Sequence, residues 1–326
     1  MTLNLFRIIL LFTLFAACNK GEKPTYIVTP YNLTIPVGFP PMAIPEDNPM
    51  TVEGVELGRK LYYDSILDKD QSRACASCHL QANSFSSKPD VLPHVNLGWN
   101  YNWLWKGNVQ GSVEDIMAFE VEGFFKTNLT NLTNHPEYPT LFKKAFNVDK
   151  INYNDIEKAL AQFIRTLNSG NSKFDKVQRS EAQFTNEENL GFELFFTERG
   201  DCFHCHATTF FSDNKLHNNA LDTKPDPGYF EITGDSLDYG KFKSPTLRNI
   251  AFTAPYMHDG RFATLEEVLN FYSEGLQTSA TVDPLMKQLS HGGVQLTLEE
   301  KNALIAFLKT LSDEEFLTNP AFSINN

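Results

Sequence analysis

Apolar side chains recur at helical spacing in the middle of the chain. Between residues 156 and 167 they are separated by three or four positions, which places them on one face of a helix, and the pattern stops at the polar stretch 169–171. The apolar positions of this helix are Ile156, Ala159, Leu160, Phe163, Ile164 and Leu167. The polar stretch that follows is a candidate domain boundary.

Three further helices are predicted from their start signals in the second half of the chain. A threonine followed three residues later by a glutamate forms a capping box, in which each side chain accepts a hydrogen bond from the other residue's backbone amide. The three pairs are Thr185 with Glu188, Thr264 with Glu267, and Thr297 with Glu300. Strand-like alternation is scarce, so the chain is predicted to be mainly helix and loop.

The first eighteen residues form an apolar run that ends at Ala16, Ala17 and Cys18. This pattern predicts a signal peptide, residues 1–18, and its end resembles a bacterial lipobox, in which the cysteine becomes the lipid-bearing N-terminus. The alternative is a signal peptide cut near an incidental cysteine. We therefore expect export to the periplasm, with anchoring as a lipoprotein through Cys18. The six prolines of residues 19–45 predict an extended tether with little packing.

Composition narrows the class of protein. The 326 residues are 41% hydrophobic, which suits two compact domains and is too polar for a protein with many membrane spans. The formal net charge of −12 is spread along the chain. An acidic surface attracts a basic redox partner or merely keeps the protein soluble, and it gives no indication of nucleic-acid binding.

The five cysteines follow a simple arrangement. Apart from Cys18 they fall in two Cys-x-x-Cys-His motifs, residues 75–79 and 202–206, so none remains for a disulfide or for completing a zinc site. In this motif the two thiols add to the haem vinyl groups, and the histidine binds the iron. Two covalently attached c-type haems are predicted. Their attachment residues are Cys75, Cys78, Cys202 and Cys205, and their proximal ligands are His79 and His206.

Several sequence blocks around these motifs resemble the bacterial dihaem cytochrome c peroxidases and their MauG relatives. The likeness extends over nearly all of residues 46–315. The matching blocks are Leu-Gly-Arg-Lys-Leu-Tyr-Tyr-Asp at 57–64, Trp-Lys-Gly at 105–107, Arg-Thr-Leu at 165–167 with Phe-Asp at 174–175, Phe-Ser-Asp at 211–213, His-Asn at 217–218, Phe-Lys-Ser-Pro-Thr-Leu-Arg-Asn at 242–249 and Ala-Pro-Tyr-Met-His-Asp-Gly at 254–260.

The resemblance implies a mainly α fold with two cytochrome-c-like haem domains packed around an interdomain cleft. Residues 46–170 would form the domain whose haem reacts with peroxide, and residues 171–315 the electron-transfer domain, followed by a tail at 316–326. The implied function is reduction of hydrogen peroxide to water with electrons from a small redox protein such as a cytochrome c. Two alternatives are MauG-like oxidation of a protein partner and a dihaem electron carrier without catalysis.

The ligands of the second haem depend on one position. Peroxidase members have a methionine fourteen residues after the histidine that corresponds to His258, and MauG members have a tyrosine, as this chain does with Tyr272. A phenolate ligand favours oxidised iron, whereas a thioether raises the potential. The alternative is that Tyr272 is a core aromatic, because it shares a helical face with other apolar residues. Met257 is a weaker ligand candidate.

The first haem needs an open position for peroxide and a carboxylate that moves a proton. Residues 80–93 contain no histidine before His94, so we expect an iron with five ligands at rest. The family's glutamate segment is not matched, and Glu120 and Glu122 are the nearest replacements for its acid–base role. Each is alternatively a solvated carboxylate.

Two further expectations come from the resemblance. Trp105 falls at the family position between the haems, where it would carry electrons, and the alternative is a core tryptophan. The carbonyls of Thr253 and Pro255 match an interdomain calcium site, but Val91 stands where the family has an asparagine ligand. One calcium ion therefore stays an open alternative.

Overall fold

The computed structural model describes residues 26–87 and 91–324. The predicted signal segment 1–18, with Cys18, lies outside the described residues. Within them, no helix combines the length and the apolar character that crossing a bilayer requires.

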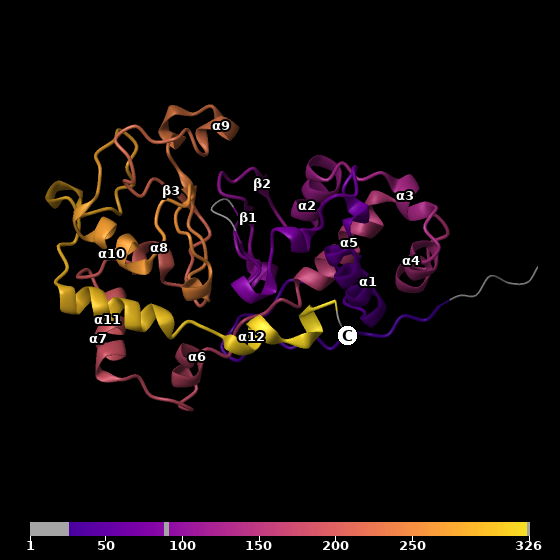
Figure 1. Ribbon diagram of the computed structural model, residues 1–326, viewed down its shortest axis with the longest axis horizontal. Coiled ribbons are helices and arrows are strands. Elements are labelled where there is room, and N and C mark those ends of the chain that lie inside the picture. The colour runs from indigo at the N-terminus through magenta and orange to yellow at the C-terminus, as the bar shows by residue number, and fades with distance from the viewer. Residues whose placement is uncertain (1–25, 88–90, 325–326) are drawn as a thin grey trace, which may run out of the picture.

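The described chain is mainly helical, as the sequence predicts, with two small antiparallel strand pairs. Figure 1 shows the two halves side by side, with α1, α2 and α5 in one and α7, α8, α10 and α11 in the other. The helices are α1 Val52–Tyr63, α2 Val113–Ala118, α3 Leu129–Thr133, α4 Tyr138–Phe146, α5 Tyr153–Ile164, α6 Lys173–Gln178, α7 Asn186–Phe195, α8 Phe203–His206, α9 Phe230–Thr233, α10 Leu265–Glu274, α11 Leu298–Lys309 and α12 Glu314–Thr318. The strands are β1 Asn102–Trp103 paired with β2 Val109–Gln110, and β3 Leu216–His217 paired with β4 Phe242–Lys243.

The predicted helix of the first half is confirmed as α5. It begins at an Asn152 cap, whose side chain accepts from the Asp155 amide, and it buries its apolar face in the first core cluster. The helix ends at Ile164, so Leu167 lies beyond it, although its side chain is fully buried. The chain turns there, and the Thr166 hydroxyl donates to the Phe163 carbonyl.

The three capping boxes of the second half are also confirmed. The caps Thr185, Thr264 and Thr297 accept from the amides three residues later, at the starts of α7, α10 and α11. Helices α7 and α11 then pack against each other around a second core cluster rich in phenylalanine. Local start signals therefore fixed where these helices begin, and their packing makes the second core.

The same helix contact occurs once in each half. A Cβ atom on Gly58 of α1 would lie 1.9 Å from the Ala159 carbonyl oxygen of α5, and one on Gly191 of α7 would lie 1.9 Å from that of Ala303 in α11. In both pairs a phenylalanine one turn further along, Phe163 or Phe307, packs beside the glycine. Two halves that use one contact in the same way support an origin by duplication.

The proline-rich segment 26–45 differs from the expectation of little packing. It is extended, as its prolines predict, but Phe39 lies edge-on against Trp99 of the first half at 5.4 Å and against Phe210 of the second half at 5.2 Å. The Trp99 indole also donates to the Pro40 carbonyl. Apolar and aromatic side chains between the prolines make this segment a strap across both halves.

The polar stretch 169–171 is a buried junction. Ser169 is fully buried, and a single carboxylate oxygen of Asp313, just after α11, accepts from its hydroxyl and from the next two backbone amides at 3.0–3.1 Å. The Asp313 amide in turn donates to the Asn249 side chain. Polar composition marks this stretch as a candidate boundary, and in the structure its hydrogen bonds to Asp313 tie it to the segment after α11.

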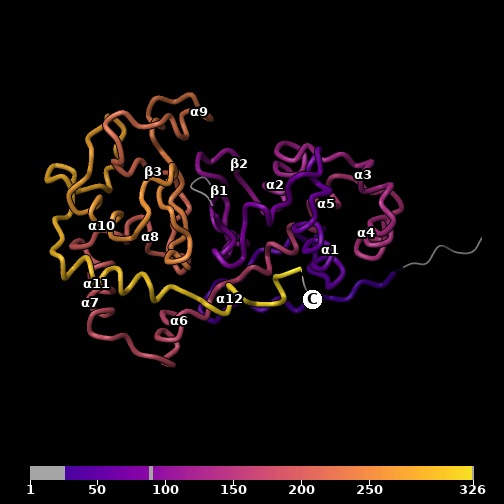
Figure 2. The backbone as a smooth tube through the Cα atoms, in the orientation of Figure 1, coloured from indigo at the N-terminus to yellow at the C-terminus, as the bar shows by residue number. Residues whose placement is uncertain are grey.

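The segment after Asp313 returns to the first half. The yellow end of the chain runs from α11 through α12 toward α1 in Figure 2. Phe316 and Phe322, which fall in the segment expected as a tail, pack into the first core cluster. The C-terminal segment therefore ties the second half to the core of the first.

One acidic residue of α5 is buried beside another carboxyl. Glu157 is 8% exposed, and burial, together with the nearby Glu122 and Asp155, raises the pKa of its carboxyl to about 7. Glu122 is exposed on the segment that follows α2. Two carboxyls that share a site in this way repel when both are charged.

The helix contact at the two glycines can be tested by adding a methyl group. We expect Gly58→Ala and Gly191→Ala each to lower the free energy of unfolding by about 2–3 kcal/mol, because the new Cβ overlaps a carbonyl oxygen that is fixed in the partner helix. Gly123→Ala is the control, since its Cβ would meet nothing closer than 3.8 Å. Denaturant unfolding of the three variants measures this, and equal effects at all three positions would contradict the contact.

The carboxyl of Glu157 gives a pH-dependent stability. Because its pKa is raised in the folded state, its favourable contribution is complete below the unfolded pKa near 4.5 and is lost as the pH rises through about 7. We expect Glu157→Gln to gain on the order of 1 kcal/mol relative to the original protein between pH 5 and pH 8. Unfolding at both pH values measures the gain, with the exposed Glu56→Gln as control. A constant difference between the two pH values would rule out the raised pKa.

Candidate functional site

The two Cys-x-x-Cys-His motifs lie in short helical turns, Cys75–Ser77 in the first half and α8 in the second. All four cysteines are free of disulfides and half-buried. Burial raises the pKa of the Cys202 thiol to about 12 and raises that of Cys75 still further. The four cysteines are unpaired, so both thiols of each motif are free for addition to a ligand.

The two motif histidines are held in the same state. Each Nδ1 lies 2.8 Å from a backbone carbonyl, that of Phe85 for His79 and that of Phe211 for His206. Burial lowers the pKa of both rings, that of His79 to about 4, so each imidazole is neutral. A neutral ring that donates from Nδ1 keeps the lone pair of Nε2 for a metal ion.

The carbonyls that orient these histidines come from an unusual backbone. Phe85 and Phe211 both adopt a positive φ, 55° and 51°, and both side chains are fully buried. Bulky residues rarely adopt this conformation, which costs of order 1–3 kcal/mol and persists where surrounding structure imposes it. Its presence after both motifs indicates that aiming the carbonyl at the histidine matters at both sites.

Each motif opens into a cavity. The first cavity, of about 940 Å³, is lined by Cys75, Cys78 and His79, and it also reaches residues of the second half. The second cavity, of about 230 Å³, is lined by Cys202, Cys205 and His206 and includes residues of the first half. The first lies within the range of cofactor pockets, about 300–1,000 Å³, and the second is smaller.

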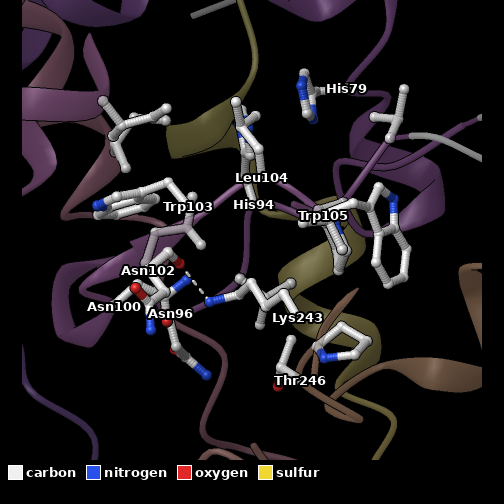
Figure 3. A pocket seen from close by; sticks show the side chains of 18 of the residues that line it. His79, His94, Asn96, Asn100, Asn102, Trp103, Leu104, Trp105, Lys243 and Thr246 are labelled. Carbon is white, nitrogen blue, oxygen red and sulfur yellow. Dashed lines mark hydrogen bonds between the residues drawn. The ribbon is translucent and has the colours of Figure 1, made fainter. Parts of the chain in front are cut away.

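Trp105 lines both cavities. Its indole Nε1 is buried and has no hydrogen-bond partner among the described residues, which is uncommon for a buried donor. Its carbonyl accepts from the Lys243 amide at 2.8 Å, which ties it to the second half. Trp105, Lys243 and His79 are labelled in Figure 3. The tryptophan therefore lies where the two cavities meet, and its role in electron transfer between haems stays a prediction.

The structure separates the two candidate glutamates. Glu120 lines the first cavity, and burial raises the pKa of its carboxyl to about 7. Glu122 is exposed and lies beside Glu157. Both belong to a π-helical segment, Phe119–Phe124, in which the Phe125 amide donates to the Glu120 carbonyl. Such wide turns are common at functional sites because they re-aim side chains.

Tyr272 of α10 lines the second cavity together with Met257. The Asn219 amide donates to the Tyr272 hydroxyl at 3.1 Å and lies 3.6 Å from the Met257 sulfur. Burial raises the pKa of Tyr272 to about 12, so the phenol is neutral without a nearby cation. Both ligand candidates therefore line the cavity, and the preference for Tyr272 over Met257 stays a prediction from sequence.

Sequence reasoning placed His94 merely in a turn after the first motif. Its ring stacks on that of His79, with centroids 3.5 Å apart and planes 20° apart, and its Nδ1 lies 3.0 Å from the hydroxyl of the buried Tyr62. Burial, followed by the proximity of His79, lowers the pKa of His94. The stacking fixes the plane of the His79 ring. The available signal was a histidine directly after Pro93 in an otherwise apolar run.

A second missed group is His217, which lines the second cavity. Burial lowers the pKa of its ring, but Asp213, then the Cys205 sulfur, and then Asp283 on the other nitrogen outweigh burial and raise it to about 11. The ring is therefore a buried cation at neutral pH. The spacing of four residues between Asp213 and His217 was its sequence signal.

In the described part of the chain, no cluster of acidic ligands is found at the position of the possible calcium site. Thr253 and Pro255 line the second cavity. Among the described residues, the grouping of histidine and carboxylate side chains close enough to share an ion is Glu198, Asp201 and His204, and Lys287 already contacts it. Calcium binding stays a prediction.

Comparison with known proteins agrees with this geometry. A family model for di-haem cytochrome c peroxidase matches residues 52–183. Cytochrome-c peroxidase IdrP1 of Denitromonas iodatirespirans is 30% identical over 334 residues, which cover 86% of this chain and 87% of that protein. Methylamine utilization protein MauG of Methylorubrum extorquens is 31% identical over 293 residues, covering 83% of this chain and 81% of that protein.

Solved structures are similar over most of the chain. A MauG-like protein associated with microbial copper homeostasis has a TM-score of 0.82 at 32% identity and covers 90% of this chain and 99% of its own. The diheme peroxidase BthA from Burkholderia thailandensis shares the fold, with a TM-score of 0.67 at 15% identity, covering 90% of this chain and 97% of its own. The chain belongs to the family of di-haem cytochrome c peroxidases and MauG proteins, which are oxidoreductases with two haems.

Proposed function

We propose that the protein is a peroxidase that carries one covalent haem in each cavity and reduces hydrogen peroxide at the first. The observation that carries this proposal is the pair of cavities, each with a thiol pair and an oriented neutral histidine, joined at Trp105. When bound, haem supplies a redox-active iron. The overall reaction takes two electrons and two protons and converts one peroxide into two waters.

Glu120 is the proposed acid–base group of the first cavity. Its carboxyl lines the space that peroxide must enter, and a pKa of about 7 lets it both accept and release a proton near neutral pH. The exposed Glu122 has no such position.

Electrons are proposed to enter from a small redox protein, such as a cytochrome c, and to cross from the second cavity to the first at Trp105. The ring lies against both cavities, and its backbone is held by Lys243. An aromatic ring between two redox centres shortens the distance of each electron-transfer step.

A second candidate function is peroxide-dependent oxidation of a protein partner, as in MauG. The observation that favours it is Tyr272 at the second cavity, because a phenolate ligand would stabilise oxidised iron. This candidate differs from the first in the source of the electrons: the partner's side chain supplies them, and no small donor protein is needed.

For the location, the proposal is export to the periplasm and attachment to the membrane by a lipid on Cys18. The support is the apolar run at residues 1–18, which ends in a lipobox-like Ala-Ala-Cys sequence. The strap formed by residues 26–45 would then begin close to the membrane.

The assignment of Glu120 is tested with two matched variants. We expect Glu120→Gln to slow the reaction with hydrogen peroxide by about 100-fold to 10,000-fold, because the amide cannot move the proton, and to abolish any rate change between pH 6 and pH 8. Glu122→Gln removes a carboxyl two residues away, and its rate of reaction with peroxide should stay within about twofold of the original rate. Stopped-flow mixing of purified protein with peroxide measures both, and equal rates in the two variants would defeat the assignment.

The ligand role of Tyr272 is tested by electron paramagnetic resonance. The ferric protein should show one high-spin and one low-spin haem, with the high-spin signal responding to peroxide. In Tyr272→Phe, which keeps the ring and loses the oxygen, the low-spin signal should be lost or replaced, because the iron exchanges its phenolate for another ligand. An unchanged signal would leave Tyr272 as a core residue. Two low-spin signals that ignore peroxide would indicate an electron carrier.

A further inference from the structure

Lys243 lies between the two cavities. It belongs to β4, lines both the first and the second cavity, and is 6% exposed. Its backbone amide donates to the Trp105 carbonyl at 2.8 Å. Figure 3 shows its side chain reaching toward Asn102 below Trp105. Peroxide chemistry as proposed above gives this lysine no task.

The ammonium group of Lys243 has neutral partners. It donates to the Asn102 carbonyl of the first half at 2.5 Å and to the side-chain oxygen of Asn214 in the second half. An ammonium has three N–H donors, so one donor remains. Among the ion pairs of the described residues none includes Lys243, and Asp213 acts on it by longer-range attraction.

An unpaired charge in this position is costly. Burial lowers the pKa of Lys243 to about 7 in the protein by itself. Buried lysines are rare unless an anion pairs with them. A residue that is buried at the wall of two cavities, and that keeps a free donor, therefore fits an anionic group inside one of them.

We propose that the Lys243 ammonium binds a propionate carboxylate of a haem held in one of the two cavities and raises the reduction potential of that haem. The proposal rests on the proposed function, because it is the haem that brings the carboxylate. Lys243 lines both cavities, so the carboxylate belongs either to a haem in the first cavity or to a haem in the second, and the experiment distinguishes the two.

The sign of the effect follows from charge. Ferric iron carries one more positive charge than ferrous iron, so a nearby ammonium destabilises the ferric state more. The pair also connects a haem to Trp105 through the backbone of Lys243, and to both halves through Asn102 and Asn214. Lys243 is thus a positioning residue that sets the potential of one centre at the point where the two cavities meet.

Spectroelectrochemical titration of the purified dihaem protein tests this. We expect Lys243→Met to shift the equilibrium toward the ferric state by about tenfold for one of the two haems, which is about 59 mV for a one-electron couple. The haem whose spectrum shifts identifies the cavity that supplies the carboxylate. Lys241→Met is the matched control, because Lys241 lines neither cavity and pairs with Asp238 at 2.9 Å. In this variant the ferric-to-ferrous equilibrium of each haem should change by less than about twofold.

Haem content separates failure of this proposal from failure of the proposed function. Intact mass shows whether the original protein carries two haems; if it carries none, the proposed function fails. Two retained haems with unchanged potentials in Lys243→Met overturn the ammonium–propionate pair alone.

Lys243→Arg keeps the charge, so the ferric-to-ferrous equilibrium of each haem should change by less than about twofold. If Lys243→Met does not fold, resonance Raman spectra of the original protein and Lys243→Arg decide. A guanidinium in place of the ammonium should shift the propionate bending bands of one haem, and unchanged bands overturn the proposal.

Discussion

The relative position of the two halves depends on the carboxylate of Asp313. One of its oxygens accepts three hydrogen bonds from residues 169–171, at the end of the first half, and its amide donates to Asn249. Asn249 in turn donates to Ser84, in the loop after the first haem motif. These groups are buried, where charge-assisted hydrogen bonds are strong and an unsatisfied partner is costly. The junction therefore ties the end of the first half to the segment after α11, and the Lys243 amide separately holds the Trp105 backbone where the two cavities meet.

The two halves use the same local construction for different chemistry. Each has a glycine contact between helices, a motif histidine that donates to a backbone carbonyl, and a phenylalanine with positive φ that aims this carbonyl. The first cavity then receives a half-buried acid, Glu120, from a π-helical turn, and the second receives a phenol, Tyr272, from α10. The two halves therefore place an equivalent motif histidine at each cavity, and the side chains that line the rest of each cavity make the two cavities unequal.

Two positively charged or basic side chains at the cavity walls have different partners. Lys243 is held by neutral oxygens from both halves, whereas His217 is held between Asp213 and Asp283. A paired cation such as His217 is already neutralised, but an unpaired one acts on whatever enters the cavity. The inference about Lys243 depends on this difference, which is a property of the folded interface.

Local sequence determined much of this protein. The two Cys-x-x-Cys-His motifs, the capping boxes at α7, α10 and α11, and the periodic face of α5 all act over a few residues, so they can be read without the fold. The different burial of Glu120 and Glu122, the stacking of His94 on His79, and the place of Lys243 were decided by tertiary structure alone. Each depends on which way a side chain points after segments far apart in the chain have packed, and neither composition nor spacing encodes that direction.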